Sequence, residues 1–145
     1  MEFSCRMKNG NKKKYLVSSC LLGLKTRYDG AAKPSEECIQ FIAGATWIPV
    51  CPEQLGGLAT PRPPAVISGG DGYDVLNGSA RVVNSENVDV TEHYKLGAEQ
   101  ALYLARKVGA DEILLKSRSP SCGCGEVLGV AAALLKSNGF LVREF

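Results

Sequence analysis

Residues 15–23 read YLVSSCLLG, a short β-rich run that meets a turn-like segment containing Gly23. Three more short apolar runs follow along the chain: TWIPV at 46–50, DEILLK at 111–116 and FLVREF at 140–145. Segments with helical signals separate these runs, and strands that alternate with helices across short connections are typical of a parallel, α/β-layered sheet. We therefore predict an α/β fold: a single domain with a small, mostly parallel, Rossmann-like sheet in three layers.

Three segments between the runs carry helix signals. In PSEECIQFIAG at 34–44, Ser35 is a candidate N-cap, two glutamates follow it and Gly44 is a stop signal. In the strongest helix, Asp89 or Thr91 is the candidate N-cap and Gly109 is the stop signal. Its apolar stripe at helical period comprises Tyr94, Gly97, Ala98, Ala101, Leu102, Ala105 and Val108. The last predicted helix is VLGVAAALLKSNG, residues 127–139.

The middle of the chain, residues 52–87, is rich in Gly and Pro. Within it, AVIS at 65–68, YDVLNG at 73–78 and SARVV at 79–83 have the pattern of short antiparallel strands, joined by GGDG and NG turns. We predict a β-hairpin excursion over residues 65–83 rather than a second domain.

Composition and charge exclude several classes of protein. The 145 residues are 45% hydrophobic and 22% charged, which is globular and excludes disordered, collagenous and coiled-coil chains. Residues 1–14 hold five basic residues against one acidic, so we expect a disordered polar tail before a single domain at 15–145. The remaining chain has twelve Lys and Arg against fourteen Asp and Glu, which argues against a nucleic-acid polymer as partner.

No apolar run is long enough to span a bilayer, and the N-terminus has no apolar core of a secretory signal. We therefore expect a cytoplasmic protein without a membrane partner, and the sequence predicts no particular oligomeric state. Disulfides are rare in that compartment, so the six cysteines need another explanation.

Three cysteines are expected at the same edge of the predicted sheet. Cys20 follows the first predicted strand, Cys51 follows the second, and Cys122 lies in the loop after the third. The carboxyl ends of parallel strands meet at the same edge of a sheet, where such folds bind ligands. Because paired Cys-x-x-Cys knuckles are absent, a compact zinc ribbon is excluded. Cys38 has the pattern of a buried helix residue, and Cys5 lies in the tail.

Three thiolates without a fourth indicate either an iron–sulfur cluster with one open iron or a three-thiolate metal site such as zinc. The spacing does not choose between them. Glu53, two residues after Cys51, is a candidate for proton transfer near the metal. The loop SRSPS at 117–121 offers hydroxyl donors and the cationic Arg118. The single histidine, His93, is expected on the surface, so a histidine-based catalytic triad is excluded.

Five segments together resemble a bacterial family that was long classed as a domain of unknown function and is now associated with thiouracil desulfidases. They are SSCLLG (18–23), RYDG (27–30), PVCPEQLGGLATPRPP (49–64), DVTEHYKLGAEQAL (89–102) and LKSRSPSCG (115–123). The resemblance runs in order from about Tyr15 to the C-terminus. Its C-P-E-x-x-G-G-L…P-R and S-x-S-P-S-C-G motifs are specific.

The resemblance implies a single domain that holds a [4Fe-4S] cluster on Cys20, Cys51 and Cys122, with one iron open to the sulfur of a small thiolated substrate. It further implies that Glu53 is the acidic catalytic residue and Ser119 the catalytic serine. The implied reaction is hydrolytic: C=S becomes C=O, and sulfide is released without redox change.

The sequence also departs from the family pattern. A Y-D-G-x-F-x-G stretch expected between S-P-S-C-G and the last helix is missing, and Cys124 offers an additional thiolate. These features keep two alternatives open: a non-catalytic metal- or sulfur-binding protein with a three-cysteine zinc or iron site, and a redox sensor that pairs Cys122 with Cys124.

Overall fold

Four parallel strands form the main sheet of the computed structural model, which describes residues 12–120 and 127–145. The spatial order of the strands is β2-β1-β5-β6. Their bounds are Lys14–Ser18 for β1, Thr46–Val50 for β2, Glu112–Leu115 for β5 and Val142–Glu144 for β6. Each coincides with one of the apolar runs of the sequence.

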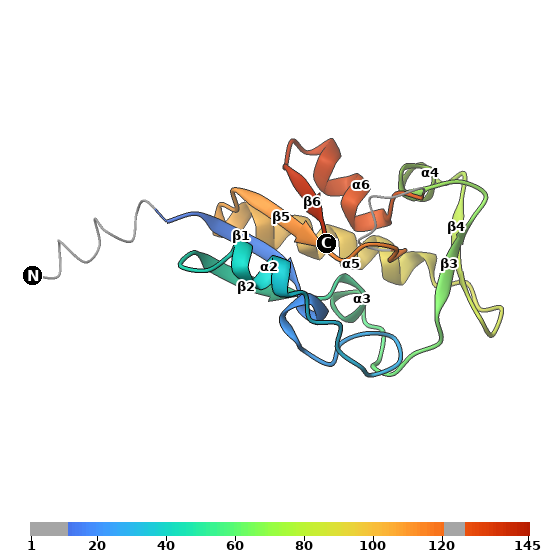
Figure 1. The fold of residues 1–145 in the computed structure, drawn as a ribbon. Coiled ribbons are helices and arrows are strands. Elements are labelled where there is room, and N and C mark those ends of the chain that lie inside the picture. The colour runs from blue at the N-terminus through green and yellow to red at the C-terminus, as the bar shows by residue number, and fades with distance from the viewer. Residues whose placement is uncertain (1–11, 121–126) are drawn as a thin grey trace, which may run out of the picture.

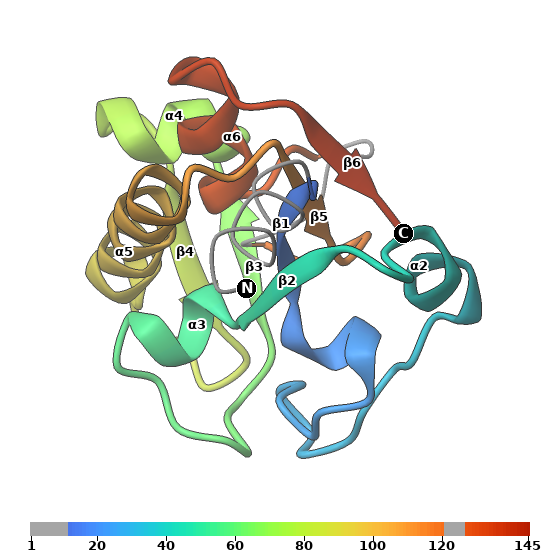
Figure 2. The same cartoon turned by 90° about the vertical axis from the view of Figure 1, so that its left-hand side faces the viewer.

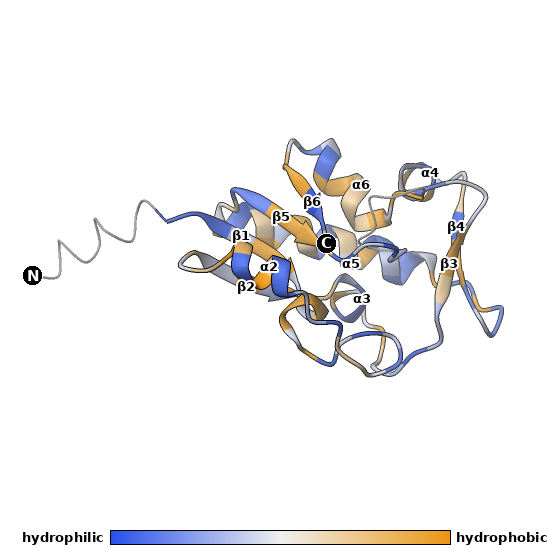
Figure 3. Cartoon of the chain, viewed as in Figure 1, coloured by the Kyte–Doolittle hydropathy of each residue, from blue (hydrophilic) through white to orange (hydrophobic). Residues whose placement is uncertain are grey.

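The two central strands, β1 and β5, are the most deeply buried. Residues 15–18 of β1 and all four residues of β5 are buried, as expected for strands covered on both faces of a parallel sheet. Pro49 is tolerated because β2 is an edge strand of this sheet, where a missing backbone N–H breaks no ladder bond on the open side. In Figure 3 the hydrophobic residues accordingly concentrate on these strands and on the helices packed against them.

Helices cover both faces of the sheet. On one face α2 (Glu36–Phe41) contributes Cys38 to a core that includes Tyr15, Val17 and Leu114. On the other face α5 (Thr91–Val108) and α6 (Val130–Ser137) pack on Leu16, Ile113 and Leu115. Figure 2 shows α2 on one side of the strands and α5 with α6 on the other. The predicted α/β, three-layer, mostly parallel fold is confirmed.

The chain direction makes β1 the point where the strand order reverses. From β1 the chain passes through the short 3-10 helix η1 (Ser19–Leu22) and α2 to β2 on one side, and it later returns to β5 on the other side. In open α/β sheets, ligands bind outside the carboxyl ends of the strands at such a reversal.

A second, two-stranded sheet lies away from the main one (Figure 1). Its strands β3 (Ala65–Ser68) and β4 (Arg81–Asn84) are antiparallel, as predicted for the hairpin excursion. The strand predicted at YDVLNG is wrong, because residues Gly72–Asn77 form the helix α4. The Asp71 side chain accepts the Asp74 N–H while the Asp74 side chain accepts the Asp71 N–H, and this capping box starts a helix.

The other helix signals hold in part. Ser35 Oγ accepts the Cys38 N–H and caps α2, and Gly109 ends α5 in the left-handed region at φ 68°. The predicted stop at Gly44 is wrong, because α2 already ends at Phe41. The predicted cap of α5 is also wrong: its N-cap is Val90, without a side-chain cap bond, and Asp89 Oδ1 accepts only the Thr91 N–H. The predicted stripe of α5 is buried except for the half-buried Val108. None of the helices in the described part of the chain is long and apolar enough to cross a membrane.

A short helix that the sequence did not predict, α3 (Pro52–Leu55), follows β2 directly and packs closely on α5. A side chain on Gly97 of α5 would collide with the Pro52 carbonyl, and one on Gly56 would collide with the His93 carbonyl. Gln100 Nε2 donates to the Leu55 carbonyl at 2.6 Å, and His93 Nδ1 lies 2.8 Å from the Gly56 carbonyl. The two glycines therefore let the backbones touch, and α5 supports α3 along its length.

Gly97→Ala is expected to lower the free energy of unfolding, by about 1–3 kcal/mol, because the new methyl group overlaps a backbone carbonyl that cannot move away easily. Gly→Ala within a helix usually raises the free energy of unfolding, so the change expected here has the opposite sign. Urea unfolding of the metal-free protein measures it. Glu99→Ala, at an exposed position of the same helix, is the matched control and should change stability by less than about 0.5 kcal/mol.

Cys38 is expected to resist alkylation in the native protein. Its side chain is fully buried (0% exposed), and burial raises the pKa of its thiol to about 11. Only the thiolate reacts, so at pH 8 about one thiol in a thousand would be reactive even if reagent reached it. Mass spectrometry after iodoacetamide treatment should find Cys38 modified only in denaturant. Rapid native labelling would contradict its placement in the core.

Candidate functional site

A cavity of about 470 Å³ lies at the carboxyl ends of β1, β2 and β5. This volume falls within the range of small-molecule sites. The wall is drawn from the segments that directly follow these three strands, together with the loop before α2 and the start of β3. The residues that carry chemistry in it are Cys20, Arg27, Lys33, Cys51, Glu53, Lys116, Arg118 and Ser119.

Two free thiols line this cavity from neighbouring strands. Cys20 lies in η1, immediately beyond β1, and its side chain is buried. Cys51 lies between β2 and α3 and is half-buried, with its Sγ 3.8 Å from the Thr26 carbonyl oxygen. Because β1 and β2 pair in parallel up to Ser18 and Val50, the two cysteines leave the sheet at the same edge.

Burial and the Glu53 carboxylate act on the pKa of both sulfurs. Burial raises the pKa of Cys20, the negative charges of Cys51 and Glu53 raise it further, and Lys116 and Arg27 oppose the effect. Burial likewise raises the pKa of Cys51, followed by the charge of Glu53, while backbone N–H groups of Gln54 and Glu53 and the Arg62 guanidinium oppose it. Thiols without a bound metal are therefore held neutral in this cavity.

Glu53 is held by a buried arginine. The Glu53 Oε2 atom lies 2.6 Å from Arg62 Nη2, and the two side chains are only 13% and 5% exposed. Arg62 does not belong to the cavity wall, whereas Glu53 does. The carboxylate thus faces the cavity while its counter-ion supports it from behind.

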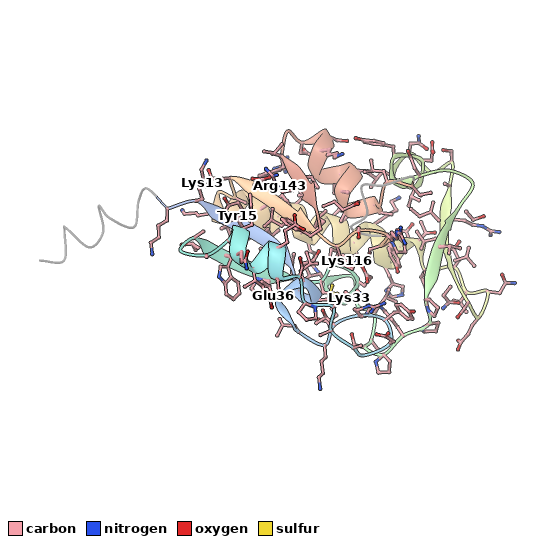
Figure 4. The ribbon with its side chains drawn as sticks, in the orientation of Figure 1. Lys13, Tyr15, Lys33, Glu36, Lys116 and Arg143 are labelled. Carbon is pink, nitrogen blue, oxygen red and sulfur yellow. The ribbon has the colours of Figure 1, made fainter. Side chains whose placement is uncertain are left out.

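The loop after β5 forms another part of the cavity wall. The Lys116 N–H donates to Ser18 Oγ at 3.1 Å, and Lys116 Nζ donates to the Ser117 carbonyl at 3.1 Å and to Ser117 Oγ at 3.0 Å. Arg118 then adopts a left-handed backbone at φ 57°, a conformation that non-glycine residues rarely take outside functional sites and turns. This turn places Ser119 and Pro120 on the cavity wall. Figure 4 shows Lys116 and Lys33 at the end of the sheet opposite to Lys13.

The structure brings four of the five predicted site residues to one cavity: Cys20, Cys51, Glu53 and Ser119. The fifth, Cys122, and also Cys124 and Ser121, lie outside the described residues, as does Cys5. Within residues 12–120 and 127–145 no three His, Cys, Asp or Glu side chains are grouped to hold a metal ion. A three-thiolate centre therefore needs a ligand beyond the two thiols described in the cavity, and Pro120, two residues before Cys122 in the sequence, lines the cavity.

The sequence indicated neither the role of Arg62 nor the contact that His93 makes inside the protein. His93 is exposed as expected, but its Nδ1 also meets the Gly56 carbonyl behind α3. In the sequence the only signal for Arg62 is its position between Pro61 and Pro63 in the P-R element of the C-P-E…P-R motif. Lys33 and Thr26 carried no signal, since the loop that holds them reaches the cavity only in the folded chain.

Comparisons with known proteins agree with this geometry. The family model described as 2-thiouracil desulfurase matches residues 15–144. The uncharacterized protein YbbK of Bacillus subtilis (strain 168) is 44% identical over 139 residues, which cover 88% of this chain and 92% of that protein.

A solved structure described as the [4Fe-4S]-dependent thiouracil desulfidase TudS superposes with a TM-score of 0.78 at 37% identity. The match covers 92% of this chain and 91% of that one. The family match spans nearly the whole sequence, from the first strand of the sheet to the last, and includes every residue of the cavity wall. The chain therefore belongs to the 2-thiouracil desulfurase family.

Proposed function

We propose that the protein is a desulfidase that holds a [4Fe-4S] cluster on Cys20, Cys51 and Cys122 and hydrolyses the C=S group of a small thiouracil-like molecule. The observation that carries the proposal is the convergence of Cys20, Cys51, Glu53 and Ser119 on one cavity. The description of TudS as [4Fe-4S]-dependent supports the cofactor. The proposed unit spans residues 15–145.

The residues of the cavity fit such a cluster. Thiolates are its usual protein ligands, and both Cys20 and Cys51 are free of disulfide bonds and line the cavity. Arg27, Lys33, Lys116 and Arg118 line the same wall, against Glu53 as the one acidic side chain of the described lining. These cations offset the negative charge that three thiolates would bring together.

The overall reaction that we propose needs no electron transfer. Water supplies the oxygen of the new C=O group, and the sulfur leaves as hydrogen sulfide. When bound, the cluster supplies a Lewis-acidic iron with an affinity for soft sulfur. Glu53 Oε2 is fixed by Arg62, so the carboxylate is oriented to accept the proton of a water that attacks the thiocarbonyl carbon. The Ser119 hydroxyl, which lines the same cavity, orients the substrate.

The ligand assignment is tested by iron and sulfide analysis after anaerobic cluster assembly. Cys20→Ser, Cys51→Ser and Cys122→Ser should each lose most of the bound iron and the visible absorption. Cys38→Ser is the matched control and should keep the iron, because Cys38 lies in the core between α2 and the sheet. Loss of iron in Cys38→Ser, or one zinc per chain with no iron in the unmodified protein, would contradict the proposal.

The catalytic roles are tested with cluster-loaded protein and 2-thiouracil, by the release of sulfide. Glu53→Gln should keep the iron yet lower kcat by about 100-fold or more, since general-base catalysis contributes that much. Ser119→Ala should also keep the iron and lower kcat/KM. Full turnover in Glu53→Gln would remove the carboxylate from the mechanism.

A further inference from the structure

Arg62 is a charged side chain that is buried next to the site but does not line the cavity. It lies in the loop between α3 and β3, and its side chain is 5% exposed. A charge is seldom buried to this extent unless it is paired and hydrogen-bonded. Its partners therefore indicate what the side chain does.

The guanidinium donates hydrogen bonds to its own loop and to the loop before α2. Nη1 donates to Thr60 Oγ1 at 3.0 Å and to the Ala59 carbonyl at 3.3 Å, and Nη2 donates to the Thr26 carbonyl at 3.1 Å. The Arg62 backbone N–H also donates to the Tyr28 carbonyl at 2.7 Å. These contacts fix the guanidinium itself, so it is a rigid support for whatever it holds.

The side chain that Arg62 holds in place is that of Glu53. Nη2 lies 2.6 Å from Glu53 Oε2, and among the described residues no other side chain bonds this carboxylate. A carboxylate with a single strong partner takes its orientation from that partner. With Oε2 occupied by Arg62, Oε1 is the oxygen available to groups in the cavity.

The same nitrogen also approaches a proposed cluster ligand. Arg62 Nη2 lies 4.0 Å from Cys51 Sγ, a long contact while the sulfur is a thiol that points at the Thr26 carbonyl. As a thiolate, Cys51 has no proton to give to that carbonyl and becomes an acceptor. Both N–H groups of Nη2 already have an acceptor, Glu53 Oε2 and the Thr26 carbonyl, so the N–H that reaches Thr26 is shared with the ligand sulfur. The guanidinium is then a charged donor beside this sulfur, and such donors raise the reduction potential of a cluster.

We propose that Arg62 is a positioning residue that couples the two halves of the site: it orients the Glu53 carboxylate toward the cavity and donates to the Cys51 thiolate. The inference rests on the proposed function. A lysine would replace it only in part, because an ammonium supplies the positive charge but cannot reach Glu53, Thr26 and Thr60 together with a planar fork.

The test is a double-mutant cycle of Glu53→Gln and Arg62→Met in cluster-loaded protein. Arg62→Met alone should lower kcat for 2-thiouracil by about 100-fold with KM within about threefold, the size expected when a reacting group is misplaced. If Arg62 acts through Glu53, adding Arg62→Met to the Glu53→Gln protein should change kcat by less than about threefold. Arg62→Lys should recover part of the loss.

A second readout does not depend on turnover. The reduction potential of the cluster, titrated by electron paramagnetic resonance, should become more negative in Arg62→Met and less so in Arg62→Lys. Arg143→Met is the matched control, because Arg143 Nε and Glu112 Oε1 form an ion pair of the same 2.6 Å length away from the cavity. It should leave kcat and the potential unchanged.

Equal kcat losses from Arg62→Met in the wild-type and Glu53→Gln backgrounds would overturn the positioning of Glu53, and an unchanged potential would overturn the contact with Cys51. If Arg62→Met does not fold, Arg62→Lys supplies both comparisons. If the wild-type protein releases no sulfide from 2-thiouracil, the proposed function fails. The potential, and the coupling of Glu53→Gln with Arg62→Met in urea unfolding, then still decide the role of Arg62.

Discussion

The central place of β1 in the sheet is the constraint on which the site depends. β1 pairs in parallel with β2 on one side and with β5 on the other, so three strands end at one edge. Each strand is short, and the chain turns immediately beyond it. Cys20 follows β1, Cys51 follows β2, and Ser119 follows β5 after a brief loop. Residues that are far apart in sequence therefore meet only because β1 lies between the other two strands.

The close approach of α3 and α5 holds Cys51 and Glu53 in place at this edge of the sheet. Cys51 and Glu53 lie at the start of a helix of only four residues, which has little stability of its own. Its carbonyls are bonded by Gln100 and faced by His93, and Gly56 and Gly97 remove the side chains that would separate the two helices. The apolar face of α5 thus fills the core under the sheet, and the N-terminal half of the helix also supports the site.

The sequence predicts much of this fold because burial leaves a clear pattern in it. The buried runs at 15–19 and 111–116 have the length of strands, and a parallel sheet necessarily brings their carboxyl ends together. The helix α4 was missed because Asp71 and Gly72 have the composition of a turn, while its capping box is a local hydrogen-bond pattern that hydrophobic periodicity does not detect. Arg62 could not be assigned a partner because its contacts reach from residue 26 to residue 62, a pairing that only the folded chain creates.

The charged residues of the cavity wall show why the net charge of the chain says little about the site. Outside the N-terminal tail, acidic residues slightly outnumber basic ones, yet the described cavity wall holds four cations and one carboxylate. Arg27 and Lys33 come from the loop before α2, and Lys116 and Arg118 come from the loop after β5, so no basic run marks them in the sequence. Three thiolates and Glu53 in a half-buried cavity would repel one another strongly in a medium less polar than water. Arg62 neutralises Glu53 from outside the cavity, which leaves the four cations of the wall to face the sulfur ligands rather than the carboxylate.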